Sequence, residues 1–226
     1  MIASRRSFIT LLFSLVCLPT LAQNVPPAAH SRDILVIGDS LSAEYGLRQG
    51  SGWVSIVAEK LKSRKYKGLI HNASISGDTT SGGLSRLSAE LARYKPGIVV
   101  IELGSNDALR GLSLTMTKDN LSAMVTAIQK SDARALLVGM QIPSNYGRRY
   151  TGQFRDLFVQ VATHYHIPLV PFLMEGMATN KALFQSDGLH PNEKGQPVLA
   201  ENVWRYLAPM LDARHAGSRN QDRAAN

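Results

Sequence analysis

Five apolar runs rich in aliphatic and β-branched residues recur along the chain. They are DILVIG at 33–38, LIHNAS at 69–74, GIVVIEL at 97–103, RALLVGM at 134–140 and IPLVPF at 167–172. A strand with one solvated face would alternate apolar and polar residues, whereas a strand buried on both faces is apolar almost throughout. The pattern therefore predicts five strands in a parallel sheet that is covered on both sides.

The stretches between these runs place apolar residues at helical spacing. Such stretches lie at 51–64, 81–94, 119–132, 153–165 and 195–211. Strands that alternate with helices, without internal repeats, predict a three-layer α/β/α domain with a doubly wound, flavodoxin-like, five-stranded parallel sheet. Ligands of this architecture bind beyond the carboxyl ends of the strands, so the segments that follow the strands are the place to look for a site.

The N-terminus has the pattern of an export signal. Arg5 and Arg6 precede an apolar stretch that is too short to span a bilayer, and Thr20, Leu21 and Ala22 supply a cleavage site before Gln23. We expect a signal peptide at 1–22, read by the general secretory route or the twin-arginine route, and a periplasmic or secreted protein. A single domain at 23–212 and a polar, disordered tail at 213–226 complete the predicted organisation.

Charge and cysteine content narrow the class of partner. The full chain has a formal charge of +8, and removal of the leader leaves 23 basic against 17 acidic residues, a charge of +6. The basic residues are scattered and not interleaved with aromatic residues, which argues against a nucleic-acid partner.

The single cysteine, Cys17, lies in the leader, so the mature domain depends on its core rather than on disulfides. We expect a monomer without a stable membrane anchor.

A serine, a histidine and an aspartate have the spacing of a catalytic triad. Ser40 follows the first strand in GDSLS, and Asp187 precedes His190 by three residues in DGLHPN. A serine hydroxyl needs a base to become a nucleophile, and the base needs a group that orients it. We expect Ser40 to attack an acyl carbonyl, His190 to take its proton and Asp187 to hold the imidazole. Alone, Ser40 would be read as a helix cap.

Three groups at the strand ends are candidates for stabilising the oxyanion that such an attack creates. They are the backbone N–H of Ser40, Gly77 in SISGD and the side-chain amide of Asn106 in GSND. Glycine lets the backbone approach a substrate closely, and each well-aimed donor contributes on the order of 3 kcal/mol in the transition state.

The four blocks GDSLS, SISGD, GSND and DGLHPN resemble, in this order, the GDSL or SGNH serine hydrolases. NASISGDTT, ELGSNDALRG, PSNYGRRY and PFLMEG further resemble the periplasmic, multifunctional acyl-CoA thioesterases, arylesterases and lysophospholipases of that family. The group usually has glycine where Ser105 stands. The resemblance implies a hydrolase of small acyl esters and thioesters that needs neither a metal nor an organic cofactor.

The substrate is the point at which the sequence leaves alternatives open. Leu109, Leu112 and Ile142, with Leu114 and Met116, predict an aliphatic surface beside the oxyanion site, although some of them could pack in the core. The alternatives are a carbohydrate O-acetyl esterase of the same fold and a non-catalytic lipid- or glycan-binding protein. Arg148 and Arg149 could meet a phosphate, with a solvated loop as the simpler reading, and His164 and His166 are read as an ordinary helix end.

Overall fold

The chain folds around one five-stranded parallel sheet. The computed structural model describes residues 31–224, with side chains described to residue 212, so the predicted leader lies outside the described residues. The strands stand in the order β2-β1-β3-β4-β5 and every neighbouring pair is parallel. Their bounds are β1 Ile34–Gly38, β2 Ile70–Asn72, β3 Ile98–Glu102, β4 Arg134–Val138 and β5 Leu169–Val170.

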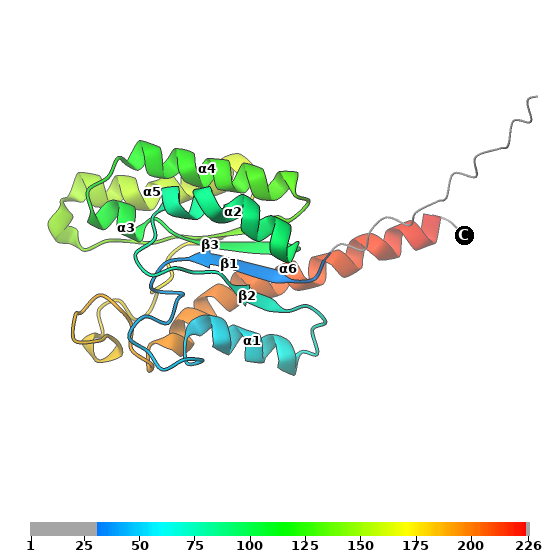
Figure 1. Cartoon of the computed structure of the whole chain (residues 1–226), viewed down its shortest axis with the longest axis horizontal. Coiled ribbons are helices and arrows are strands. Elements are labelled where there is room, and N and C mark those ends of the chain that lie inside the picture. Colours follow the sequence, from blue (N-terminus) through cyan, green and yellow to red (C-terminus); the bar gives the residue numbers. More distant parts are fainter. Residues whose placement is uncertain (1–30, 225–226) are drawn as a thin grey trace, which may run out of the picture.

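Helices cover both faces of this sheet, as the sequence predicts. The helices are α1 Trp53–Ser63, α2 Thr80–Tyr94, α3 Ser105–Leu109, α4 Leu114–Lys130, α5 Arg148–Tyr165 and α6 Gln196–Ala224, with short 3₁₀ turns η1 Ser144–Tyr146 and η2 Lys181–Leu183. Helices α1 and α6 pack together on one face, and α2, α4 and α5 pack on the other (Figure 1). The three-layer, flavodoxin-like prediction is confirmed, and its strand order puts a switch point between β1 and β3.

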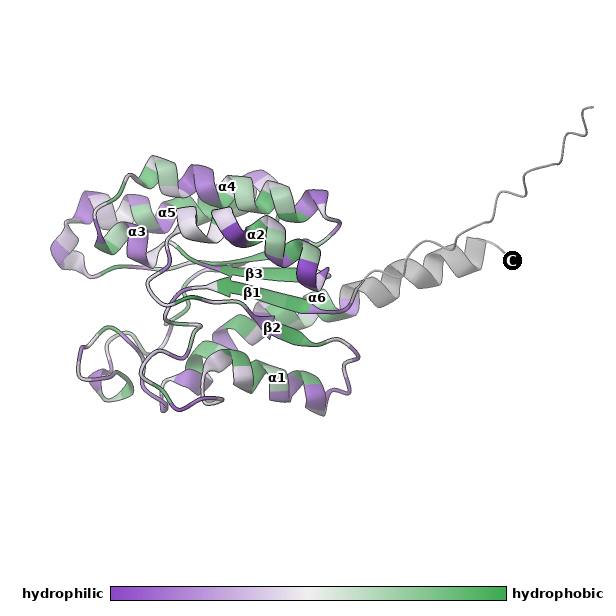
Figure 2. Ribbon diagram, viewed as in Figure 1, coloured by the Kyte–Doolittle hydropathy of each residue, from purple (hydrophilic) through white to green (hydrophobic). Residues whose placement is uncertain are grey.

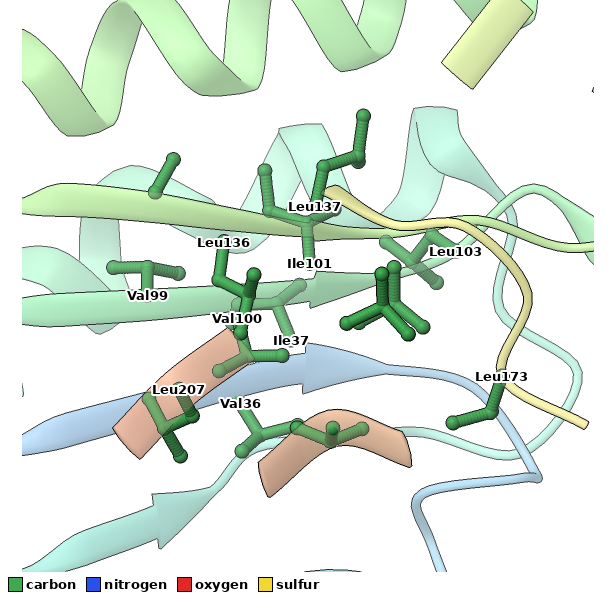
Figure 3. Close-up of a cluster of buried hydrophobic side chains, with 14 of the residues drawn as sticks. Val36, Ile37, Val99, Val100, Ile101, Leu103, Leu136, Leu137, Leu173 and Leu207 are labelled. Carbon is green, nitrogen blue, oxygen red and sulfur yellow. The ribbon is translucent and has the colours of Figure 1, made fainter. Parts of the chain in front are cut away.

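The strands form the centre of the hydrophobic core. All five residues of β1 and of β3 are buried, and Figure 2 shows both strands as apolar while the helices turn polar residues outward. Val36 of β1, Val100 of β3 and Leu207 of α6 belong to one cluster of buried side chains (Figure 3). Burying one such aliphatic side chain contributes about 1.5–3 kcal/mol, so the sheet is a rigid base for the loops at its edge.

The last helix is longer than the sequence analysis predicts. Helix α6 runs to Ala224, whereas the helical pattern in the sequence ends at 211. The polar, disordered tail at 213–226 stays a prediction.

Candidate active site

Ser40 lies on the turn that follows β1, at the switch point of the sheet. The turn is closed by Asp39, whose side chain accepts from the backbone N–H of Leu41 at 3.0 Å and whose carbonyl accepts from that of Ala43 at 2.9 Å. The next helix begins only at Trp53, so Ser40 does not cap it. The alternative reading of Ser40 as a helix cap is wrong.

The three predicted triad residues meet although Ser40 and His190 are far apart in the sequence. The Oγ of Ser40 is 2.9 Å from Nε2 of His190, and Nδ1 of His190 is 2.7 Å from Oδ2 of Asp187. The other oxygen of Asp187 accepts from the backbone N–H groups of Leu189 and His190, at 2.9 and 3.0 Å. These contacts leave the hydroxyl facing a ring nitrogen whose partner nitrogen is held by a carboxylate.

The surroundings of Asp187 keep it ionised. Partial burial alone would raise its pKa, but the backbone N–H groups of His190 and Leu189 and the ring of His190 act more strongly and lower the pKa to about 2. Tyr45 packs against the other side of the ring, with 4.7 Å between the centroids. His190 is thus fixed from both sides.

The side chain of Asn106 lies beside the Ser40 turn and already has two acceptors. Its Nδ2 donates to Oδ2 of Asp39 at 3.0 Å and to the carbonyl of Asp78 at 2.9 Å. An amide NH₂ has two hydrogens, so a bond from Asn106 to an oxyanion would replace or share one of these. Ser105, which precedes it, is buried, and both residues lie in α3, which begins shortly after β3 ends at Glu102.

Gly77 occupies an exposed loop after β2. Its φ of +80° is a conformation that favours glycine, and its carbonyl accepts from Arg110 at 2.9 Å. It is absent from the lining of the cavity that contains Ser40. A donor role for Gly77 therefore requires the loop to approach the bound substrate.

Sequence reasoning missed a buried pair of carboxyl groups under the nucleophile. Glu102, at the end of β3, is fully buried and accepts from the Ser42 hydroxyl at 2.6 Å and from the Asp39 N–H at 3.4 Å. A side chain at Gly38 would meet Ser42 and Glu102 at 2.7 and 2.9 Å, so glycine is required there. The signal in the sequence was a glutamate within an otherwise apolar strand.

Burial governs the ionisation of this pair. It raises the pKa of Asp39 to about 6, against the opposing effects of the Leu41 N–H, the charge of His190 and the amide of Asn106. Burial also raises the pKa of Glu102 well above its usual range, and the charge of Asp39 adds to this effect. At neutral pH the pair therefore avoids carrying two full charges.

A cavity of about 660 Å³ opens beside Ser40 and His190. Its apolar lining is Leu41, Leu109, Met140, Ile142, Pro143, Phe172, Met174, Ala178, Phe184 and Leu189. Leu109 and Ile142 line it as the sequence predicts, but Leu112, Leu114 and Met116 do not. The methionines and phenylalanines were missed, although Met140, Phe172 and Met174 stand in GMQIP and PFLMEG, which overlap the ends of the fourth and fifth predicted runs.

Leu112 belongs instead to the turn between α3 and α4. Its N–H donates to the carbonyl of Asp107 at 2.9 Å, and its own carbonyl accepts from the Tyr150 hydroxyl at 3.1 Å. It is half-buried in that turn rather than facing the cavity. The sequence places a residue in a loop but does not fix the direction of its side chain.

The remaining candidates have structural surroundings. Thr79 caps α2, and Asp78, which precedes it, pairs with Arg86 at 2.9 Å. His164 and His166 stand at the end of α5, and within the described residues no three acidic, histidine or cysteine side chains gather as a metal site. Arg148 and Arg149 are exposed in the first turn of α5.

Comparison with known proteins gives one family. A model described as the GDSL-like Lipase/Acylhydrolase family matches residues 36–198. The chain is 45% identical to Esterase TesA of Pseudomonas aeruginosa over 81% of its own length and 91% of that protein. It is 37% identical to Thioesterase 1/protease 1/lysophospholipase L1 of Escherichia coli strain K12, over 82% of this chain and 88% of that protein.

Solved structures agree with this family assignment. The crystal structure of TesA superposes with a TM-score of 0.77 at 45% identity, covering 79% of this chain and 99% of that one. The psychrotrophic esterase EstA from Pseudoalteromonas sp., inhibited by monoethylphosphonate, also gives 0.77, at 40% identity and with 80% and 100% coverage.

Proposed function

Because the chain belongs to the GDSL-like lipase/acylhydrolase family and is a hydrolase of esters, we propose that it cleaves acyl esters and thioesters through an acyl-enzyme on Ser40. The observation that carries the proposal is the unbroken contact from Ser40 Oγ to His190 Nε2 to Asp187, with distances of 2.9 and 2.7 Å. In this proposal Ser40 is the nucleophile, His190 the base and Asp187 the group that orients the base.

The reaction proceeds in two halves. His190 Nε2 takes the Ser40 proton while Oγ bonds to the acyl carbon, and the tetrahedral adduct then expels the alcohol or thiol, which receives that proton. Water next gives a proton to His190 and attacks the acyl-enzyme. Collapse of the second tetrahedral adduct returns the proton to Ser40 and releases the acid. Asp187, whose pKa of about 2 keeps it ionised at neutral pH, stabilises the imidazolium in both halves.

The oxyanion of each half is stabilised by hydrogen-bond donors at the strand ends. We assign this role to the backbone N–H of Ser40, to Gly77 and to the side-chain amide of Asn106. Asn106 is supported by its place in the cavity lining next to Ser40. Gly77 is supported by the left-handed backbone that opens the loop after β2. This machinery needs neither a metal nor an organic cofactor.

The cavity supports medium or long acyl chains as substrates, in acyl-CoA, aryl esters or lysophospholipids. Its lining is mostly aliphatic and aromatic carbon, with Leu109 and Ile142 among the lining residues. A carbohydrate O-acetyl esterase would instead need polar groups that pair with sugar hydroxyls. We also propose that the enzyme is exported with cleavage before Gln23 and acts as a monomer.

A chain-length series tests the substrate assignment. Each buried methylene contributes up to about 0.8 kcal/mol, so p-nitrophenyl octanoate should exceed the acetate in kcat/KM by about fiftyfold or more even at half that value. Medium-chain acyl-CoA should likewise be cleaved faster than acetylated sugars. Ser40→Ala serves as the control for background hydrolysis. A preference for acetyl groups would instead identify a carbohydrate esterase with the same triad.

A further inference from the structure

Exposed apolar side chains gather at the carboxyl edge of the sheet. Among the residues whose side chains are described, seven large hydrophobic residues are exposed, and one of them follows each of the five strands: Tyr45, Ile75, Met116, Tyr146 and Leu189. The other two, Leu69 and Val159, lie apart from this edge, before β2 and on α5. Carboxyl ends of parallel strands share one edge, so the five residues that follow these ends lie toward the same edge of the sheet, and we call them the apolar rim.

Three residues of the apolar rim lie beside the catalytic cavity. The Tyr45 ring packs on His190, and Leu189 is part of the cavity lining. The hydroxyl of Tyr146 donates at 3.3 Å to the carbonyl of Leu109, which also lines the cavity. Single exposed apolar residues are ordinary, but a set gathered beside one opening marks a surface that binds something.

Positive charge accompanies the apolar rim. The same loops carry six exposed cationic side chains: Arg48, Arg110, Arg148, Arg149, Lys181 and Lys194. The acidic side chains there are mostly engaged, since Asp187 holds His190, Asp78 pairs with Arg86 and Asp107 accepts from Thr80. Glu193 lies 3.9 Å from Arg48, which leaves Glu175 as the other exposed acid on these loops.

Arg148 and Arg149 occupy positions that helix stability does not favour. They stand in the first turn of α5, where the helix dipole is positive and acidic residues are preferred. Two cations at that place raise the local positive potential beside the rim. An anionic partner would lower it.

We propose that the apolar rim and the arginines beside it dock the enzyme on an anionic lipid surface, which delivers acyl substrate into the cavity. The apolar side chains enter the headgroup region while the arginines meet lipid phosphates. Among the described residues no helix has the length and apolar character of a membrane span, so the attachment is peripheral and reversible. The inference rests on the proposed function, because an acyl-lipid hydrolase is what benefits from such a surface.

Vesicle binding tests the proposal independently of catalysis. Ser40→Ala protein, recovered after export, is sedimented with phosphatidylglycerol vesicles and with phosphatidylcholine vesicles. We expect binding to the former that weakens as salt is raised, and much less binding to the latter. Adding Arg148→Glu and Arg149→Glu should weaken binding to phosphatidylglycerol at least about tenfold, since each cation near an anionic surface contributes roughly fivefold.

Matched variants distinguish the effect of the rim on binding from the effects of net charge and of surface hydrophobicity elsewhere. Lys65→Glu with Lys67→Glu makes the same change of charge beyond the end of α1 and should leave most binding intact. Ile75→Ser with Met116→Ser should weaken vesicle binding, whereas Leu69→Ser with Val159→Ser should not. None of the four apolar positions lines the cavity, so turnover of a soluble short ester should stay unchanged in all of these.

Several results would contradict the proposal that this surface docks on anionic lipid. They are equal binding to both lipids, equal losses in the rim variants and their matched controls, or no binding of the Ser40→Ala protein. Unchanged vesicle binding with a raised KM for acyl-CoA in the arginine variant would assign those cations to nucleotide phosphates instead. Loss of the proposed function would appear separately, as absent turnover of the soluble ester by the wild-type protein.

Discussion

Asp187 and Asp39 both lie near the reacting groups, but in opposite environments. Asp187 is partly exposed, accepts two backbone N–H groups and the His190 ring, and has a pKa near 2. Asp39 is buried beside Glu102, and its pKa is about 6. The difference teaches that surroundings decide the charge of each carboxyl: Asp187 stays charged, as its proposed support of an imidazolium requires, while Asp39 holds the turn and Asn106.

The largest effect should come from Asp187→Asn. An amide cannot stabilise the imidazolium and favours the wrong ring tautomer, so we expect kcat to fall about 10⁴-fold with the fold intact. Steady-state kinetics on a soluble ester measures this. Glu175→Gln, which changes an exposed acid on the same side of the molecule, is the matched control and should retain full activity. A loss of less than tenfold in Asp187→Asn would remove Asp187 from the triad.

The two aspartates should also affect stability with opposite signs. The folded pKa of Asp39, about 6, lies above its ordinary value of 3.8, so its contribution to folding is present below about pH 4 and lost as the pH rises through 6. This change is on the order of 3 kcal/mol. Asp187 has the lowered pKa, so its contribution is present above about pH 4 and lost as the pH falls toward 2.

Urea unfolding between pH 2 and pH 8 measures both effects. Relative to the wild type, Asp39→Asn should gain stability as the pH rises from 4 to 7, and Asp187→Asn should lose its disadvantage as the pH falls toward 2. Parallel curves for the wild type and Asp39→Asn would show that burial does not perturb Asp39.

Asn106→Ala should lower kcat by on the order of a hundredfold with little change in KM, because the amide acts mainly on transition-state charge. The same substitution also removes the hydrogen bond that Asn106 donates to Asp39. If the role of Asn106 were purely structural, the variant would lose stability rather than kcat. Measuring kcat, KM and unfolding together separates the two. A rise in KM alone would make Asn106 a residue that positions substrate.

The smallest effect concerns the acidic limb of the pH–rate profile. Activity should fall as the pH is lowered, because only a neutral His190 can accept the Ser40 proton. Ionised Asp39 favours the protonated imidazole, so Asp39→Asn should move this limb to lower pH by less than about one unit. The profile of kcat/KM is measured from pH 5 to 9. An unmoved limb would mean that Asp39 and His190 do not interact.

The strands, and the three residues that meet in the Ser40–His190–Asp187 contact, followed from the sequence because their signals are local. Apolar runs locate β1 and β3 almost to the residue, and four short motifs locate Ser40, Asn106, Asp187 and His190. β5 is shorter than its run because prolines flank it at 168 and 171 and interrupt strand pairing. Helix α3 was missed because five residues carry no helical period.

The features that the sequence did not give depend on tertiary contacts. The burial of Asp39 against Glu102 needs β1 and β3 to be neighbours, and the residues of neither strand specify which strands pair. Leu112 was predicted to line the cavity, but the Tyr150 hydroxyl from α5 helps to hold its turn elsewhere. Local patterns thus specify which residues reach the edge of the sheet, and packing specifies where they point.

The most direct test of the central claim is covalent labelling of the nucleophile. The protein is treated with a fluorophosphonate, digested, and its adduct located by mass spectrometry. The proposed mechanism predicts one phosphonyl group per chain, on Ser40, with loss of turnover in proportion to labelling, and neither adduct nor turnover in Ser40→Ala. An adduct on another residue, or turnover retained by Ser40→Ala, would contradict it.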